Sequence, residues 1–221
     1  MNDAATEIKK QWRIIATGPS SILELRALCP FRRYPPKTLH FRAKEHESVD
    51  ACREAFEAKA LELNADGYNI YIVMNPIRPD FQGNAATDQD VLNRDLVLID
   101  IDRATTAKEP ANDAEVEEAR KLADAVEEHL RSKRCGHHIR TMSGNGHHLY
   151  YVLSELPNDI HSTTVIEGFL KQLATHFNNG MVKIDTTVFN ASRITKVLGT
   201  IARKGIETED RPYRMASLYE K

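Results

Sequence analysis

Hydrophobic positions along this 221-residue chain follow two spacings, one typical of helices and one typical of strands. Over residues 48–64, apolar side chains recur every three or four positions, which predicts an amphipathic helix of about four turns. The same spacing follows Asn112, where Glu115 three residues later completes a capping box. A further run over residues 166–177 has this period too, so the sequence predicts three amphipathic helices.

Short runs rich in β-branched and aromatic residues lie between these helices and predict strands. Two of them cover residues 68–74 and 96–101, and a third, shorter run covers residues 182–184. Residues 138–141 and 148–153 flank a glycine turn, which predicts a hairpin-like pair of strands. The order of elements is therefore a mixture of α and β.

The composition excludes several classes of protein. With 41% hydrophobic and 28% charged residues, the chain has ordinary globular composition. The longest apolar stretches have five to seven residues, whereas a bilayer span needs about 20, so no membrane segment is expected. The first residues carry acids instead of the basic residues of a secretory signal, so export is not expected. Cys29, Cys52 and Cys135 are scattered, which argues against a disulfide framework or a zinc ribbon and fits a reducing cytoplasm.

Charge is segregated along the chain, although the formal net charge is only −2. Residues 26–44 hold six basic residues and no acid, and residues 193–214 hold six basic residues against three acids. Residues 113–128 have the opposite character, with seven acids and two basic residues. The total argues against a protein that coats nucleic acid, whereas the two basic segments would attract phosphates if they are more than ordinary solvated surface.

The run Leu-Val-Leu-Ile-Asp-Ile-Asp at residues 96–102 is the most informative one for chemistry. Successive side chains of a strand alternate between its faces, so Asp100 and Asp102 share one side. Adjacent carboxylates repel one another unless a cation lies between them, and hard oxygen ligands favour Mg²⁺ or Mn²⁺. Asp185, after the apolar run at 182–184, would add a third carboxylate. Three carboxylates on neighbouring strands commonly hold two metal ions for phosphoryl transfer, whereas a strand that simply exits into solvent is the alternative.

Two other segments carry features of phosphate binding. The glycine turn that begins at Ser143 exposes backbone N–H groups suited to an anion. It ends in His147 and His148, which alternate faces, so at most one shares a side with a substrate. Zinc is not expected, because neither a cysteine nor a third histidine lies at ligand spacing. If residues 190–196 form a helix, Arg193 and Lys196 lie on one face and would clamp phosphates.

Together and in this order, these motifs resemble the archaeo-eukaryotic primase superfamily. The similarity is to the primase-polymerase domains of phage, plasmid and mobile-element replication proteins, and it covers most of the chain. Residues 96–102 match the first motif, residues 143–148 the second, and Ile184 with Asp185 the third. The segment from residue 185 to residue 214 is similar to the phage-type subgroup in order and spacing, but departs from it at Ala191, Ser192 and Tyr213.

The resemblance implies an α+β, two-lobed catalytic core, with an N-terminal α/β unit, a C-terminal sheet like an RNA-recognition motif, and the active site in the cleft between them. Residues 1–221 would form one primase-polymerase domain, with lobes at about 1–90 and 91–221. Members of the superfamily polymerise NTPs, dNTPs or both on a DNA template. By resemblance, two Mg²⁺ or Mn²⁺ ions are held by three carboxylates, and the triphosphate is bound by four other residues. The implied metal ligands are Asp100, Asp102 and Asp185, and the implied nucleotide-binding residues are Ser143, His148, Arg193 and Lys196.

The implied partners are a single-stranded DNA template, a primer, and a helicase domain or protein of the same replication system. The residues expected to contact DNA are Arg32, Arg33, Arg203 and Lys204. The expected setting is the cytoplasm of a bacterium, with the protein encoded by the host, a phage or a plasmid. One alternative is a catalytically inactive DNA-binding or replication-initiator module, against which the three carboxylates and the motif histidine argue. Another is a histidine-dependent rolling-circle nicking enzyme, which needs two alternating histidines, whereas those found here are adjacent.

Overall fold

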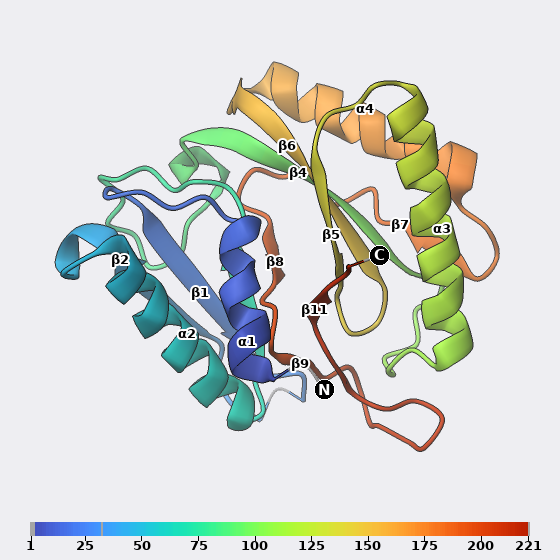
Figure 1. Ribbon diagram of the computed structural model, residues 1–221, viewed down its shortest axis with the longest axis horizontal. Coiled ribbons are helices and arrows are strands. Elements are labelled where there is room, and N and C mark those ends of the chain that lie inside the picture. The colour runs from blue at the N-terminus through green and yellow to red at the C-terminus, as the bar shows by residue number, and fades with distance from the viewer. Residues whose placement is uncertain (1–2, 32, 221) are drawn as a thin grey trace.

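Two antiparallel sheets form the centre of the molecule in this computed structural model, which describes residues 3–31 and 33–220 (Figure 1). Helix α2 covers one sheet, and helices α3 and α4 cover the other. The pairings within both sheets are antiparallel, with helices packed against the sheets, and the predicted α+β architecture is confirmed.

The elements account for most of the described chain. The helices are α1 (Ala4–Lys9), α2 (Val49–Ala65), α3 (Asp113–Ser132) and α4 (Ile160–Phe177), with the 3₁₀ turns η1 (Lys10–Arg13), η2 (Ala43–Glu45) and η3 (Asp88–Asp90). The longer strands are β1 (Ile22–Leu28), β2 (Lys37–Arg42), β3 (Asn69–Val73), β4 (Asn93–Arg103), β5 (His138–Met142) and β6 (His147–Pro157). The short strands are β7 (Val182–Ile184), β8 (Ile194–Lys196), β9 (Ile201–Ala202), β10 (Arg214–Met215) and β11 (Ser217–Leu218). None of the helices in the described ranges is long and apolar enough to cross a membrane.

The first sheet has the strand order β2-β1-β3-β8. Its core side chains include Leu25 and Ile70, which are fully buried, and Phe56 of α2 belongs to the same core. The fourth strand, β8, comes from much later in the chain, and its Lys196 pairs with Tyr71 of β3. The sheet therefore draws on both ends of the sequence.

The second sheet has the strand order β11-β5-β6-β4-β7. Ile99 and Ile101 of β4 are fully buried, whereas the alternate residues Asp100 and Asp102 are partly exposed, as strand periodicity predicts. Helix α3 begins at the predicted capping box, in which Asn112 and Glu115 bond each other's backbone N–H groups at 2.9 Å. Helices α3 and α4 are thus packed on one face of the sheet, and side chains of the other face, such as Asp100, are directed away from them.

Three parts of the sequence prediction need correction. Residues 194–196 form a strand and not part of a helix, because β-branched Ile194 and Thr195 pair with the free edge of β3. Helix α4 begins at Ile160, earlier than predicted, because the Asp159 side chain accepts a hydrogen bond from the Ser162 N–H. Strands β1 and β2 lie in a region where no strand was predicted.

Candidate active site

A pocket of about 430 Å³ is lined by residues from both sheets. From the second sheet come Asp100 and Asp102 of β4 and His148 of β6. The lining also includes four basic residues, namely Arg193 just before β8, Lys196 at the end of β8, and Arg203 and Lys204 after β9. Acidic and basic side chains therefore line the same cavity.

Asp100 lies opposite His148 in the register of β4 and β6. The imidazole Nε2 lies 3.4 Å from the Asp100 Oδ1. Burial alone would raise the pKa of the Asp100 carboxyl, but the interaction with His148 and the nearby cations Arg193 and Lys204 more than offset this and hold the pKa below its ordinary value. The carboxylate is thus kept ionised in its partly buried position.

Asp102 has a cation of its own. Its Oδ2 lies 2.9 Å from the Lys204 Nζ, and its Oδ1 accepts a hydrogen bond of 2.8 Å from the backbone N–H of Arg103. The repulsion expected between two adjacent carboxylates is therefore balanced by protein groups, His148 for Asp100 and Lys204 for Asp102.

His148 is fixed by a cluster of hydroxyl groups. Its Nδ1 lies 3.0 Å from the Tyr150 hydroxyl, which is also hydrogen-bonded to the Thr195 Oγ1. Tyr150 is fully buried, and burial raises its pKa, so its hydroxyl keeps its proton. Because Nδ1 is bonded to this cluster, Nε2 is the ring nitrogen that meets the carboxylate.

His147 points away from the pocket. Its Nδ1 accepts a hydrogen bond of 3.3 Å from the Arg140 Nε, and its ring meets the edge of Tyr219. Burial, together with the charge of Arg140, lowers the pKa of His147 to about 4, so the ring is neutral at physiological pH. The two adjacent histidines therefore lie on opposite faces of β6 and cannot share one ligand.

The glycine turn between β5 and β6 is held tightly against β4. Ser143 Oγ lies 3.2 Å from both the N–H and the carbonyl of Gly146, which closes the turn. Gly144 has φ +101°, a conformation that favours glycine, and a Cβ at Gly146 would overlap the Ile101 carbonyl oxygen. Ser143 thus lines the pocket as part of a turn whose position depends on its glycines.

Lys196 is only 5% exposed, and its Nζ donates to the Ile201 carbonyl at 3.1 Å. Burial, with a further contribution from Arg203, lowers the pKa of Lys196 to about 7. Two guanidinium nitrogens, Nε of Arg193 and one Nη of Arg203, are buried without a hydrogen-bond partner among the described residues. An anion bound here would accept hydrogen bonds from these two buried nitrogens.

Asp185 is placed differently from the other two carboxylates. Its backbone N–H donates to the Asp100 carbonyl at 2.8 Å, which brings the two residues side by side. Its carboxylate, however, accepts hydrogen bonds from the N–H and hydroxyl of Thr187, at 2.8 and 2.7 Å, and does not line the pocket. Within the described ranges, no group of three or more His, Cys, Asp or Glu side chains is arranged to hold a metal ion.

The residues expected to contact DNA are divided. Arg203 and Lys204 line the pocket itself, beside the two carboxylates. Arg33 lies in the exposed loop after β1, with its guanidinium 5.4 Å from the centre of the Phe31 ring. Arg32 lies outside the described residues.

Sequence reasoning missed the groups that orient His148. Tyr150 follows it by two positions and therefore shares its face of β6, so strand alternation could have found it. Thr195 had no such signal, because it reaches this cluster only through the pairing of β8 with β3.

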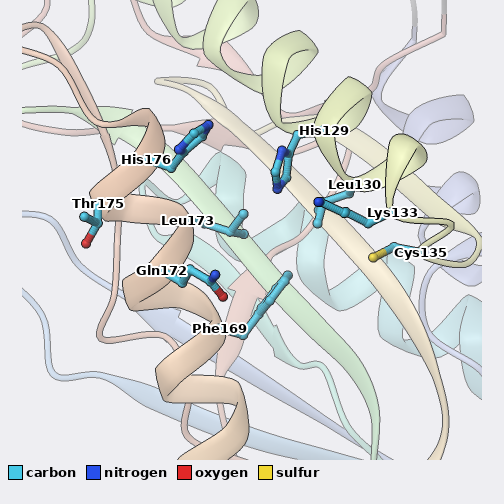
Figure 2. A pocket seen from close by; sticks show the side chains of 9 residues that line it. All are labelled: His129, Leu130, Lys133, Cys135, Phe169, Gln172, Leu173, Thr175 and His176. Carbon is cyan, nitrogen blue, oxygen red and sulfur yellow. The ribbon is translucent and has the colours of Figure 1, made fainter.

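A separate pocket of about 560 Å³ lies between the C-terminal turns of α3 and α4 (Figure 2). His129 and His176 approach each other there, with ring centres 5.4 Å apart, above Leu173 and Phe169. Its lining includes no carboxylate. The acid–base pairing that marks the first pocket is therefore missing from this one.

Comparison with known proteins adds the family context. No protein-family model and no curated protein sequence matches the chain. Among solved structures, primase RepB′ superposes with a TM-score of 0.54 at 11% sequence identity, over 98% of this chain and 56% of that one. The chain therefore spans little more than half the length of that primase.

Two further structures were determined with DNA. The catalytic domain of primase RepB′ in complex with initiator DNA gives a TM-score of 0.53 at 11% identity, over 99% of this chain and 85% of that one. The polymerase domain of Mycobacterium tuberculosis ligase D in complex with DNA gives 0.53 at 13% identity, over 96% and 80%. These likenesses confirm the α+β fold predicted from the motifs. The chain has the fold shared by these primase and polymerase domains.

Proposed function

We propose that this protein catalyses DNA-templated nucleotidyl transfer, as a primase, a polymerase or both. The observation that carries the proposal is the pairing, in one pocket, of Asp100, Asp102 and His148 with four basic side chains. In such a pocket the carboxylates suit divalent metal ions and the basic side chains suit the phosphates of a nucleoside triphosphate. The similarity in fold to primase and polymerase domains supports this choice of reaction.

The basic residues would bind the triphosphate. Arg193 and Arg203 each have a buried guanidinium nitrogen in need of an acceptor, and phosphate oxygens meet that need. Lys196 would gain a proton on binding, because a polyanion beside it favours the charged form. His148, oriented by Tyr150, would contribute a further donor from Nε2.

The carboxylate oxygens of Asp100 and Asp102 suit Mg²⁺ or Mn²⁺ as ligands. Asp100 and Asp102 offer hard oxygen ligands at the pocket surface, and Asp185 would join them if its carboxylate exchanged its Thr187 bonds for a metal. When bound, such ions would lower the pKa of the attacking 3′-hydroxyl and neutralise charge on the triphosphate and leaving pyrophosphate. The two carboxylates would hold the reacting groups in place on the rigid strand β4.

The test is nucleotide incorporation. The protein is incubated with a single-stranded DNA template, with and without an annealed primer, in Mg²⁺ or Mn²⁺ with labelled NTPs or dNTPs. We expect metal-dependent products that require the template and disappear in Asp102→Asn, with the exposed Asp210→Asn as control. DNA binding without incorporation under any of these conditions would support the inactive initiator module instead. The helicase partner and the phage or plasmid setting stay predictions.

A further inference from the structure

The loop between β1 and β2 carries an unusual surface. Phe31 is 41% exposed and Tyr34 is 56% exposed, and they are the only aromatic residues in the described ranges that are this open to solvent. Single exposed apolar residues are common, whereas neighbouring ones rimmed by polar residues often mark an interaction site. Two of them, three positions apart in a single loop, indicate a contact surface.

The basic residues of this loop are available to a partner. Elsewhere in the basic segment at 26–44, Arg26 is paired with Glu24 and Arg42 with Glu45. Arg33 and Lys37 have no carboxylate partner in the part of the chain that the structure describes, and instead lie over the rings of Phe31 and Tyr68, at 5.4 and 5.0 Å. Their charges are therefore free for an anion.

The loop begins at the wall of the candidate active site. Leu28, three residues before Phe31, lines the pocket and pairs with Asn69 at the start of β3. Asn69 in turn bonds the backbone of Arg203, another lining residue. The loop then packs back on Tyr68, whose ring centre is 6.0 Å from that of Tyr34.

From this arrangement we infer that residues 29–31 and 33–37 form a stacking platform for single-stranded DNA that leaves the pocket. Phe31 and Tyr34 would each receive the face of an unpaired base, while Arg33 and Lys37 would contact the flanking phosphates. Aromatic rings beside unpaired cations are the combination that binds single strands without regard to sequence. Prolines at 30, 35 and 36 restrict the backbone, so less conformational freedom is lost when DNA is bound. The inference rests on the proposed function for the choice of DNA as partner.

The test separates stacking from charge by using two labelled oligonucleotides of equal length, one intact and one made of abasic sites. Fluorescence anisotropy without nucleotide or metal gives the Kd of each. We expect the double variant Phe31→Ala/Tyr34→Ala to bind the intact strand at least about tenfold more weakly, and the abasic strand as the unchanged protein does. Arg33→Gln/Lys37→Gln should weaken both strands and reduce the salt slope by about 0.7 for each phosphate that is no longer neutralised.

Two controls guard against loss of structure. Phe31→Tyr/Tyr34→Phe keeps both rings and should bind within about twofold of the unchanged protein, as should Ile160→Ala, which removes an exposed apolar side chain at the start of α4. Equal loss on both oligonucleotides, or no loss on either, would overturn the inference. Because the assay needs no catalysis, a stacking-dependent Kd in a protein that incorporates no nucleotide would refute the proposed function and leave the platform intact.

Discussion

The imidazole of His148 and the carboxylate of Asp100 face each other across strands β6 and β4, with Nε2 3.4 Å from Oδ1. The two side chains belong to directly opposed strand positions, so the proposed metal ligand and the proposed triphosphate-binding donor would be held in a fixed relation. A substitution at either position is therefore expected to affect metal binding and triphosphate binding together.

Replacing Asp100 by Asn should reduce nucleotide incorporation by at least about a hundredfold, since the amide cannot supply the negative charge that a divalent ion requires. The folded state should survive with a small loss of stability, because the carboxylate is held ionised by neighbouring cations. By linkage, that contribution is present above the unfolded pKa and is lost as the pH falls through the lower folded pKa. Primer extension and urea unfolding measure the two effects, and full activity in Asp100→Asn would exclude this residue as a metal ligand.

Lys204→Met should increase the affinity for Mn²⁺ measured without nucleotide. In the present structure the ammonium lies 2.9 Å from Asp102 and occupies the position where a cation is needed, so a metal ion must displace it. Isothermal titration calorimetry gives the Kd, and Lys171→Met is the matched control, because this lysine also pairs with a carboxylate, that of Glu167 in α4. An unchanged or weaker Mn²⁺ affinity in Lys204→Met would show that Asp102 does not bind the metal.

Lys196→Met should make the protein more stable and a poorer nucleotide binder. The folded pKa of about 7 lies below the ordinary 10.5, so the folded state binds fewer protons between these values, and the lysine destabilises it most at and below pH 7. We expect a gain of about 1–4 kcal/mol at pH 6 that fades toward pH 10. The KM for nucleotide should rise about tenfold, whereas Lys196→Arg, which keeps the charge, should preserve it.

Gly146→Ala should disturb the turn beside β4, because the added methyl group would overlap the Ile101 carbonyl oxygen. We expect a loss of stability of about 1–3 kcal/mol together with reduced incorporation. Gly168→Ala in α4 is the control, since an added Cβ there meets nothing within 4 Å and alanine favours a helix. Equal thermal stability of the two variants would contradict the close approach of the turn to β4.

His147→Gln should reduce the dependence of the unfolding free energy on pH below neutrality. The folded pKa of about 4 lies below the ordinary 6.5, so the unfolded chain binds more protons in this window and stability falls as the pH drops from 6.5 to 4. For one histidine the loss is at most about 3 kcal/mol. Glutamine can still accept from Arg140 but does not titrate, so the difference in unfolding free energy between pH 7 and pH 4.5 should be smaller in the variant.

The contacts that could be predicted from the sequence are those within neighbouring strands. Alternation along β4 predicted that Asp100 and Asp102 share a side, and alternation along β6 predicted that only one of the adjacent histidines does so; His148 is the one that lines the pocket. The glycine turn and the cap of α3 were also visible as local motifs. Each of these depends on residues only a few positions apart.

The remainder depends on contacts between distant segments. Residues 194–196 form a strand only because β3 has a free edge, and Lys196 lies in the pocket as a consequence of that pairing. The direction of the Asp185 carboxylate is decided by the Thr187 hydroxyl, which no spacing rule predicts. Contacts outside the local sequence pattern thus set the positions of Lys196 and of the Asp185 carboxylate.

The large sequence separation between β8 and its partner β3 also affects how the molecule folds. Tyr71 pairs with Lys196, and helices α3 and α4 lie between these two residues in the sequence. Pairing of such distant segments has a large loop-closure entropy and slows folding, and it links the two lobes into one cooperative unit. Lys196 therefore reaches the pocket only when this distant pairing is made, whereas Asp100 and Asp102 are placed by pairing within the second sheet.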